Sequence, residues 1–184
     1  MLQTTKKNHT TISGDSVADA LERFGFRKDI AGSEFDNAVK AVVTAHNNMR
    51  GLFISGNVGC GKTHLMRTIA QLNRAPISRW VYVKDMARIA HLKYTPEFFY
   101  DSNIYLDDIG CEEKMKEYGN TIDVVGDFIQ MYHQFGRGKL FATTNLSSAK
   151  LNERYDSRVV DRLLDMCVVY HMGGESKRKR IIIK

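Results

Sequence analysis

A glycine-rich loop between an apolar run and a helix-like segment is the feature that most restricts how this chain can fold. The segment SGNVGCGKTHLM, residues 55–66, follows the apolar run GLFIS and fits the pattern G-x-x-x-x-G-K-[ST]. Glycines allow the backbone N–H groups of such a loop to point inward at an anion, and the positive end of the following helix points at the same place. The sequence therefore predicts a strand, a phosphate-binding loop and a helix in succession.

Each fixed residue type of this pattern has a chemical use. We expect Lys62 to reach the β and γ phosphates of ATP and the hydroxyl of Thr63 to bind Mg²⁺. An ordinary glycine-rich turn is the alternative, and the strand and helix on either side argue against it. The nucleotide-binding residues predicted from the motif are Gly56, Asn57, Val58, Gly59, Cys60, Gly61, Lys62, Thr63 and His64.

Short apolar runs alternate with helix-like segments along the chain. Buried parallel strands are typically continuous apolar runs, and repeated alternation of strand and helix indicates an α/β protein. The expected strands are residues 51–55, 79–84, 103–108, 139–145 and 167–172. The expected helices are residues 15–26, 33–49, 62–72, 85–93, 121–135 and 152–165, with Asp15 or Ser16 available to cap the first and Ser33 the second. The pattern predicts a three-layer α/β fold around a central, mainly parallel sheet of five strands.

Two adjacent acids end the third of these strands, in the segment NIYLDDIG. Ligands of an open parallel sheet bind at the carboxyl ends of its strands, so these acids should lie beside the phosphate loop. Alternation along a strand sends their side chains in different directions. We assign Asp107 to Mg²⁺ and Asp108 to the attacking water, which it would orient or deprotonate. A turn or a helix cap is the alternative for this pair considered by itself.

The fourth strand also ends in polar residues, in the segment KLFATTNLSS. Thr143, Thr144 and Asn145 would reach the same edge of the sheet as the two acids. We expect Asn145 to position the attacking water or to sense the γ-phosphate. An asparagine in a turn after a strand is common without any such role, and this alternative stays open.

Arginines recur at every fourth residue in the segment NERYDSRVVDRLLD. This spacing predicts one exposed stripe on a single helix, opposite an apolar face that packs on the core. The arginines are Arg154, Arg158 and Arg162, and the apolar residues are Val159, Val160, Leu163 and Leu164. One guanidinium of the stripe can act as a finger that stabilises transition-state charge in a neighbouring subunit. A solvated charged face is the alternative.

Composition places the chain among globular proteins of one domain. It has 184 residues, of which 43% are hydrophobic and 26% charged. No apolar run approaches the roughly 20 residues that span a bilayer, and the three cysteines are too far apart to suggest a zinc site or a disulfide framework. We therefore expect a cytoplasmic protein without membrane contact.

The net charge of +6 is concentrated near residues 176–184, which carry five basic residues and no acid. Such a segment suits a polyanion such as nucleic acid, because its charges neutralise phosphates. A solvated tail, or an edge strand protected by flanking charges, is the equally weighted alternative. We expect three parts: a flexible segment at residues 1–15, a core at 16–175 and a basic tail at 176–184.

Five segments occur in the order found in bacterial helicase-loader and transposition-helper ATPases: GNVGCGKTHL, YLDDIG, FATTNLS, SRVVDRL and GESKR. From about Phe24 to Arg178 the chain resembles the DnaC/IstB-like branch of the AAA+ superfamily of P-loop NTPases. The resemblance implies an ATPase that binds ATP and Mg²⁺ and associates with single-stranded DNA. It would deliver or remodel a DNA-bound partner, typically a replicative helicase or else a transposase.

The same resemblance implies roles for particular residues. Asp107 and Asp108 would form the acidic pair and Asn145 the sensor. Arg158 would be the finger, with Arg162 as the reserve candidate. A finger that acts on a neighbouring subunit implies a homo-oligomer.

Three functions are compatible with a phosphate-binding loop in this chain. The leading one is a DNA-associated ATPase that loads a helicase in DNA replication, with a transposition helper as the alternative. A small P-loop kinase would need a basic lid and an acceptor pocket, and neither is clear in the sequence. A nucleotide switch without hydrolysis is the third, and the intact pair of Asp107 and Asp108 argues against it.

Overall fold

The structure is a computed structural model that describes residues 11–75, 79–86, 102–117 and 120–174. Most of the predicted helix at 85–93 and the whole basic segment at 176–184 lie outside the described residues. No described helix combines the length and the apolar character that crossing a bilayer requires.

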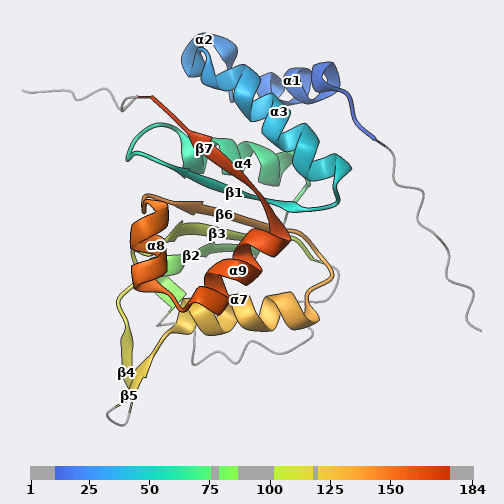
Figure 1. Cartoon of the computed structure of the whole chain (residues 1–184). Helices are drawn as coiled ribbons and strands as arrows, with labels where there is room; N and C mark the ends of the chain where they lie inside the picture. The colour runs from blue at the N-terminus through green and yellow to red at the C-terminus, as the bar shows by residue number, and fades with distance from the viewer. Residues whose placement is uncertain (1–10, 76–78, 87–101, 118–119, 175–184) are drawn as a thin grey trace, which may run out of the picture.

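A five-stranded sheet forms the centre of the molecule (Figure 1), and all of its neighbouring strands are parallel. Its order is β2-β3-β6-β1-β7. The strands are β1 (Gly51–Gly56), β2 (Trp80–Tyr82), β3 (Ile104–Ile109), β6 (Leu140–Thr144) and β7 (Cys167–Met172). All five predicted strands are present, and the predicted α/β class with a parallel sheet is confirmed. Because β6 lies between β1 and β3, the carboxyl ends of these three strands meet at one edge.

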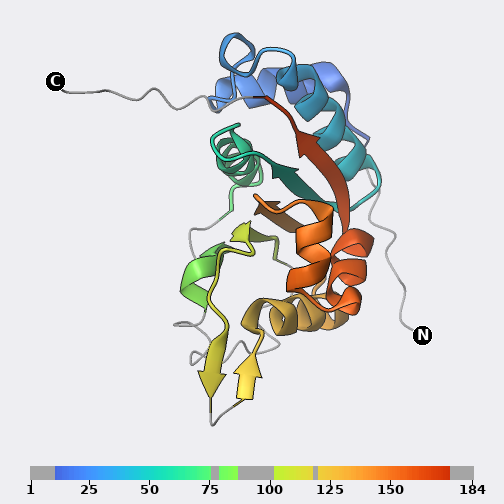
Figure 2. The same cartoon turned by 60° about the vertical axis from the view of Figure 1, so that its left-hand side comes forward.

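Helices cover both faces of the sheet (Figures 1 and 2). On one face lie α1 (Gly14–Arg23), α2 (Lys28–Ala31), α3 (Glu34–Asn47) and α4 (Lys62–Leu72). On the other lie α7 (Val124–Phe135), α8 (Ser148–Arg154) and α9 (Ser157–Met166). A short 3-10 helix, η2 (Val83–Asp85), follows β2. The three layers agree with the predicted architecture.

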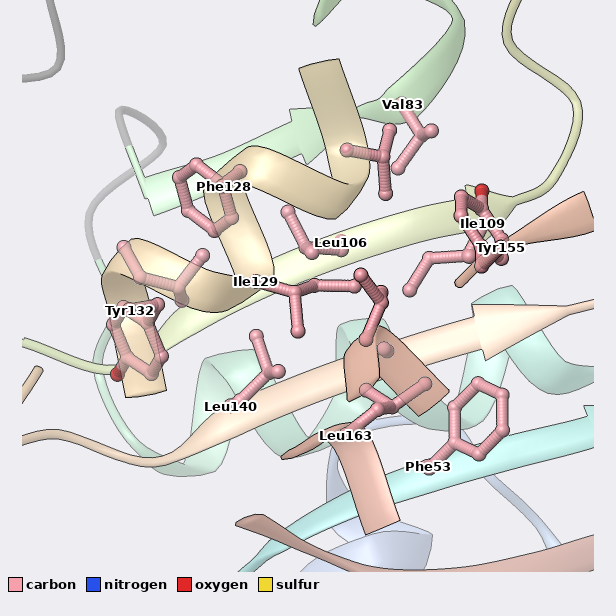
Figure 3. Close-up of a cluster of buried hydrophobic side chains, with 14 of the residues drawn as sticks. Phe53, Val83, Leu106, Ile109, Phe128, Ile129, Tyr132, Leu140, Tyr155 and Leu163 are labelled. Carbon is pink, nitrogen blue, oxygen red and sulfur yellow. The ribbon is translucent and has the colours of Figure 1, made fainter. Parts of the chain in front are cut away.

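Alternation along the strands divides the core into two apolar clusters. In β1, Leu52 and Ile54 pack in the cluster under α1, α3 and α4, whereas Phe53 points to the opposite face. That second cluster lies under α7 and α9 (Figure 3) and includes Leu106, Phe128, Ile129, Leu140 and Leu163. Strands buried on both faces account for the continuous apolar runs in the sequence.

The predicted helix at 121–135 begins too early. Residues 120–122 form strand β5 (Asn120–Ile122), which pairs antiparallel with β4 (Met115–Glu117). This two-stranded hairpin projects away from the main sheet in both views (Figures 1 and 2). Helix α7 starts only after Asp123, whose side chain accepts a hydrogen bond from the N–H of Gly126.

The predicted single helix at 152–165 is wrong. Helix α8 ends at Arg154, and α9 starts at Ser157 after a corner at Tyr155 and Asp156. Asp156 caps the new helix by accepting a hydrogen bond from the N–H of Arg158. Leu164, predicted to face the core, is 43% exposed because the buried stripe of α9 is narrower than expected.

The cap of the first helix also differs from the prediction. Ser13, rather than Asp15 or Ser16, is the N-cap of α1, and its side chain accepts a hydrogen bond from the N–H of Ser16 at 3.3 Å. Ser33 occupies the predicted cap position of α3, but its side chain makes no capping hydrogen bond. Contacts also begin earlier than residue 16, because the N–H of Ile12 donates to Asn47.

These two serines allow a matched test of stability. Ser13→Ala removes a side-chain cap and should lower the free energy of unfolding by about 1 kcal/mol. Ser33→Ala makes the same change at a cap position without such a bond, and its effect should stay within about 0.5 kcal/mol. Urea denaturation of both variants measures the difference. Equal losses would contradict the capping role of Ser13.

Candidate functional site

The predicted phosphate loop connects β1 to α4, with its glycines in conformations that other residues rarely adopt. Gly59 has φ 86° and Gly61, directly before α4, has φ 115°. Gly56 is restricted by space as well, because a Cβ there would lie 2.2 Å from the carbonyl oxygen of Met172 in β7. Gly56 therefore lets β1 lie directly against β7, and the left-handed backbone of Gly59 and Gly61 forms the turn that leads into α4.

Lys62 lies at the bottom of this loop and is only 5% exposed. Its Nζ donates hydrogen bonds to the carbonyl oxygens of Gly56 and Asn57, at 2.9 and 2.8 Å. It also donates to Oδ1 of Asn145 at 2.6 Å. These three acceptors are uncharged, so they orient the ammonium group without neutralising it. A phosphate in the loop can pair with its charge.

Asp107 lies beneath the loop and is 4% exposed. Its Oδ1 accepts hydrogen bonds from the hydroxyl of Thr63 at 2.9 Å and from that of Thr143 at 2.8 Å. Neighbouring ligands of an octahedral Mg²⁺ ion, each at about 2.1 Å, lie roughly 3 Å apart. The oxygens of Thr63 and Asp107 have that separation and the oxygen chemistry that Mg²⁺ prefers, so the pair fits this ion.

Asp108 faces another way from Asp107, as the alternation of a strand predicts. It lines the cavity above the loop, and its Oδ1 accepts a hydrogen bond from the side-chain amide of Asn145 at 2.7 Å. Its backbone has φ 65° at an irregularity in the pairing of β3 with β6, and its N–H donates to the hydroxyl of Thr143. Non-glycine residues rarely adopt this backbone region, although aspartate tolerates it better than most.

Five of the predicted site residues thus form one connected group, with the hydroxyl of Thr143 joining Asp107 to the N–H of Asp108. Asn145 accepts from Lys62 and donates to Asp108, while Thr63 donates to Asp107. Residues from β1, β3, β6 and α4 meet because the carboxyl ends of parallel strands share one edge of the sheet.

The cavity at this edge has a volume of about 500 Å³. Its walls include Val58 to His64, Asp108 and Asn145. They also include residues that the sequence analysis missed, namely Phe26, Arg27, Ala31 and Arg67. Nothing in the local pattern marks these residues: Phe26, Arg27 and Ala31 reach the loop only through the packing of the segment from the end of α1 to α2, and Arg67 lies on α4 beyond the motif.

One predicted residue of the loop explains that packing. His64 lies on α4, and its Nε2 is 2.7 Å from the carbonyl oxygen of Gly25. Its ring also lies 5.9 Å from that of Phe26. His64 thereby joins the helix after the phosphate loop to the segment that forms the opposite wall of the cavity.

The three arginines do not form the predicted stripe on one helix. Arg154 ends α8, and its guanidinium pairs with the buried carboxylate of Glu112 at 2.9 Å. Arg162 is half-buried on α9 and donates to the side chain of Gln130. Arg158 is exposed in the first turn of α9 and does not line the cavity of its own chain. Of the three arginines, only Arg158 is exposed as predicted.

No protein-family model and no curated protein sequence matches the chain. Solved structures do resemble it. A DnaC helicase loader superposes with a TM-score of 0.58 at 22% identity, over 77% of this chain and 91% of that one. A proposed primosome component from Streptococcus pyogenes serotype M3 has a TM-score of 0.57 at 18% identity, over 80% and 84% of the two chains.

A third similar structure is that of AMPPCP-bound DnaA from Aquifex aeolicus. Its TM-score is 0.53 at 21% identity, and the match covers 77% of this chain but only 47% of DnaA. Identities this low describe the fold rather than the activity. The sheet order, the phosphate loop and these structural similarities together give the chain a DnaC-like AAA+ fold, as the sequence predicted.

Proposed function

We propose that this protein is an AAA+ ATPase that binds ATP with Mg²⁺ at the carboxyl edge of β1, β6 and β3. The observation that carries the proposal is the hydrogen-bonded group in which Asn145 connects Lys62 to Asp108, while Thr63 reaches Asp107. An ordinary glycine-rich turn has no need of two acids, a sensor amide and a buried lysine in contact with one another.

Each residue has a role in this proposal. Lys62 exchanges its carbonyl acceptors for the β and γ phosphates. Thr63 and Asp107 hold Mg²⁺, which neutralises charge on the phosphate oxygens when bound. Asp108 accepts a proton from the attacking water or orients it, because its carboxylate lines the cavity. Asn145 holds that carboxylate and the lysine at a set separation.

Arg158 is the proposed finger. It is exposed at the start of α9 and lies outside the cavity of its own chain, so it would act on the site of a neighbouring subunit in a homo-oligomer. Arg162 becomes the weaker candidate because it already donates to Gln130.

We further propose that the ATPase is a cytoplasmic protein that associates with single-stranded DNA and loads a replicative helicase. Support comes from the fold shared with a DnaC helicase loader and from the five basic residues between 176 and 184. A transposition helper that acts with a transposase remains the alternative, and no structural observation favours it. The kinase and switch hypotheses receive no added support.

Phosphate release from ATP, with and without single-stranded DNA, tests this proposal. We expect release to rise with DNA, because a strand that binds several subunits brings Arg158 of one subunit close to the site of another. Arg158→Ala should bind ATP normally and lose the stimulated release. Arg23→Ala, a change of the same kind on the exposed face of α1, is the matched control.

The outcomes separate the parts of the proposal. ATP binding without release in any condition would contradict the ATPase and favour a switch. Release that DNA does not change would contradict the DNA association. If residues 176–184 contact the phosphates, their removal should reduce the slope of log K against log salt concentration by about 3.5, given five charges on a single strand.

A further inference from the structure

Glu112 is a buried carboxylate outside the proposed catalytic group. Its side chain is 3% exposed, yet it lies only four residues after Asp108. A buried carboxylate is stable only with several hydrogen-bond donors around it. Glu112 has three, which come from two separate parts of the chain.

The first donor belongs to the turn after β3. Oε2 of Glu112 accepts a hydrogen bond from the N–H of Gly110 at 2.8 Å. The same turn is closed by the N–H of Cys111, which donates to the carbonyl oxygen of Asp108. Glu112 is therefore tied to the backbone next to the proposed catalytic acid.

This turn has little freedom to move independently of β6. The hydroxyl of Thr144 donates to the carbonyl oxygen of Ile109 at 2.7 Å. Gly110 has φ 95°, and a Cβ on it would lie 2.3 Å from the side chain of Leu146, directly after Asn145. A displacement of Asp108 on nucleotide binding would therefore be transmitted to Gly110 and to Glu112.

The other two donors belong to the corner between α8 and α9. Oε1 of Glu112 accepts hydrogen bonds from the hydroxyl of Tyr155 at 2.5 Å and from the guanidinium of Arg154 at 2.9 Å. The same guanidinium donates to the carbonyl oxygen of Glu112 at 2.7 Å. Three hydrogen bonds thus connect Glu112, in the turn after β3, to the last turn of α8 and to the corner that follows it.

The corner sets the direction in which α9 starts. Tyr155 is buried in the cluster under α7 and α9, together with Ile109 (Figure 3). Asp156 then caps α9, and Arg158 follows in its first turn. Burial is the larger cause and the hydrogen bond to Glu112 the smaller cause that raise the pKa of Tyr155. Its hydroxyl is therefore protonated at neutral pH and can donate to Glu112. Arg158 is therefore connected to Glu112 through Tyr155, which contacts Glu112, and through Asp156, which caps α9.

We propose that Glu112 is a positioning residue that couples the nucleotide state sensed at Asp108 to the α8–α9 corner, and hence to the orientation of Arg158. The inference rests on the proposed function and adds a regulatory connection to it. Through this connection, a subunit with ATP in its own site presents its arginine correctly to the next subunit. Glu112 touches neither nucleotide nor water in this account and acts only through Gly110, Arg154 and Tyr155.

Tyr155→Phe is the most specific test, because it removes one hydroxyl and keeps the buried ring. Tyr132→Phe is the matched control: Tyr132 is also buried in that cluster, and its hydroxyl donates to the carbonyl oxygen of Ser102 at 2.9 Å, before the start of β3. Hydrogen exchange measured by mass spectrometry, with and without Mg²⁺ and AMPPCP, gives a readout that does not depend on hydrolysis.

In the unaltered protein we expect the nucleotide to slow exchange both in the loop at 56–64 and in the corner at 153–158. Tyr155→Phe should keep the effect in the loop and lose it in the corner, whereas Tyr132→Phe should keep both. Turnover should follow the same pattern, with kcat of Tyr155→Phe about tenfold lower at unchanged KM, as expected for a misplaced catalytic group.

The results distinguish this inference from the function on which it rests. If the nucleotide slows exchange in the loop but never in the corner, or if Tyr155→Phe behaves like Tyr132→Phe, the coupling is refuted and the ATP site stands. If the loop itself does not respond, both proposals fail. Arg154→Lys, which keeps the charge but not the fork of the guanidinium, should repeat the result if Tyr155→Phe does not fold.

Discussion

Replacing Lys62 with alanine is expected to weaken ATP binding at least about 100-fold and to abolish turnover. Two charge-assisted hydrogen bonds to phosphate, at about 1.5 kcal/mol each, account for a loss of about 3 kcal/mol. The buried ammonium group donates to uncharged oxygen acceptors, so its charge is available for the phosphates. Titration with a fluorescent ATP analogue measures the affinity.

The control for this prediction is Lys40→Ala, which removes an exposed lysine from α3 and should leave ATP binding unchanged. A melting curve of both variants separates lost binding from lost folding. Near-normal affinity or turnover in the Lys62→Ala protein would refute the assignment of the nucleotide site to this loop.

Asp108→Asn is expected to lower the rate of hydrolysis by about 10²- to 10⁴-fold, because an amide cannot accept the proton of the attacking water. Its ATP affinity should stay within about threefold, since Lys62 and Thr63 make the proposed phosphate and Mg²⁺ contacts. Asparagine tolerates the left-handed backbone found at this position, where φ is 65°, so the fold should persist. Single-turnover measurements at saturating ATP determine the rate directly.

Asp161→Asn is the matched control, because Asp161 is exposed on α9 and lies outside the cavity. Hydrolysis by Asp108→Asn at more than about a tenth of the normal rate would show that this carboxylate is not the base. In that case, Asn145 would orient the attacking water without a carboxylate base.

Local patterns in the sequence were sufficient for the main framework. Continuous apolar runs predicted all five strands of the sheet, because strands buried on both faces need them. The glycine-rich loop and the acids near the end of β3 were recognisable for a related reason. Their side chains lie at strand ends, and parallel strands bring their ends together whatever the remaining sequence is.

Helix boundaries were less predictable where a short segment had two competing structures. Residues 152–165 have helical periodicity throughout, yet Asp156 ends the pattern by capping a second helix. Residues 120–122 lie next to a real helix but pair with a strand instead. The choice in each case depends on hydrogen bonds and packing that a residue pattern does not contain.

The sequence by itself determined the fold class, the glycine-rich loop between β1 and α4 and the polar residues at the strand ends, because each depends on neighbouring residues along the chain. Tertiary structure alone decided the far wall of the cavity, where His64 holds the segment with Phe26, and the contact of Glu112 with Arg154 and Tyr155. These partners are about 40 residues apart, and only the packing of helices on the sheet determines which of them meet.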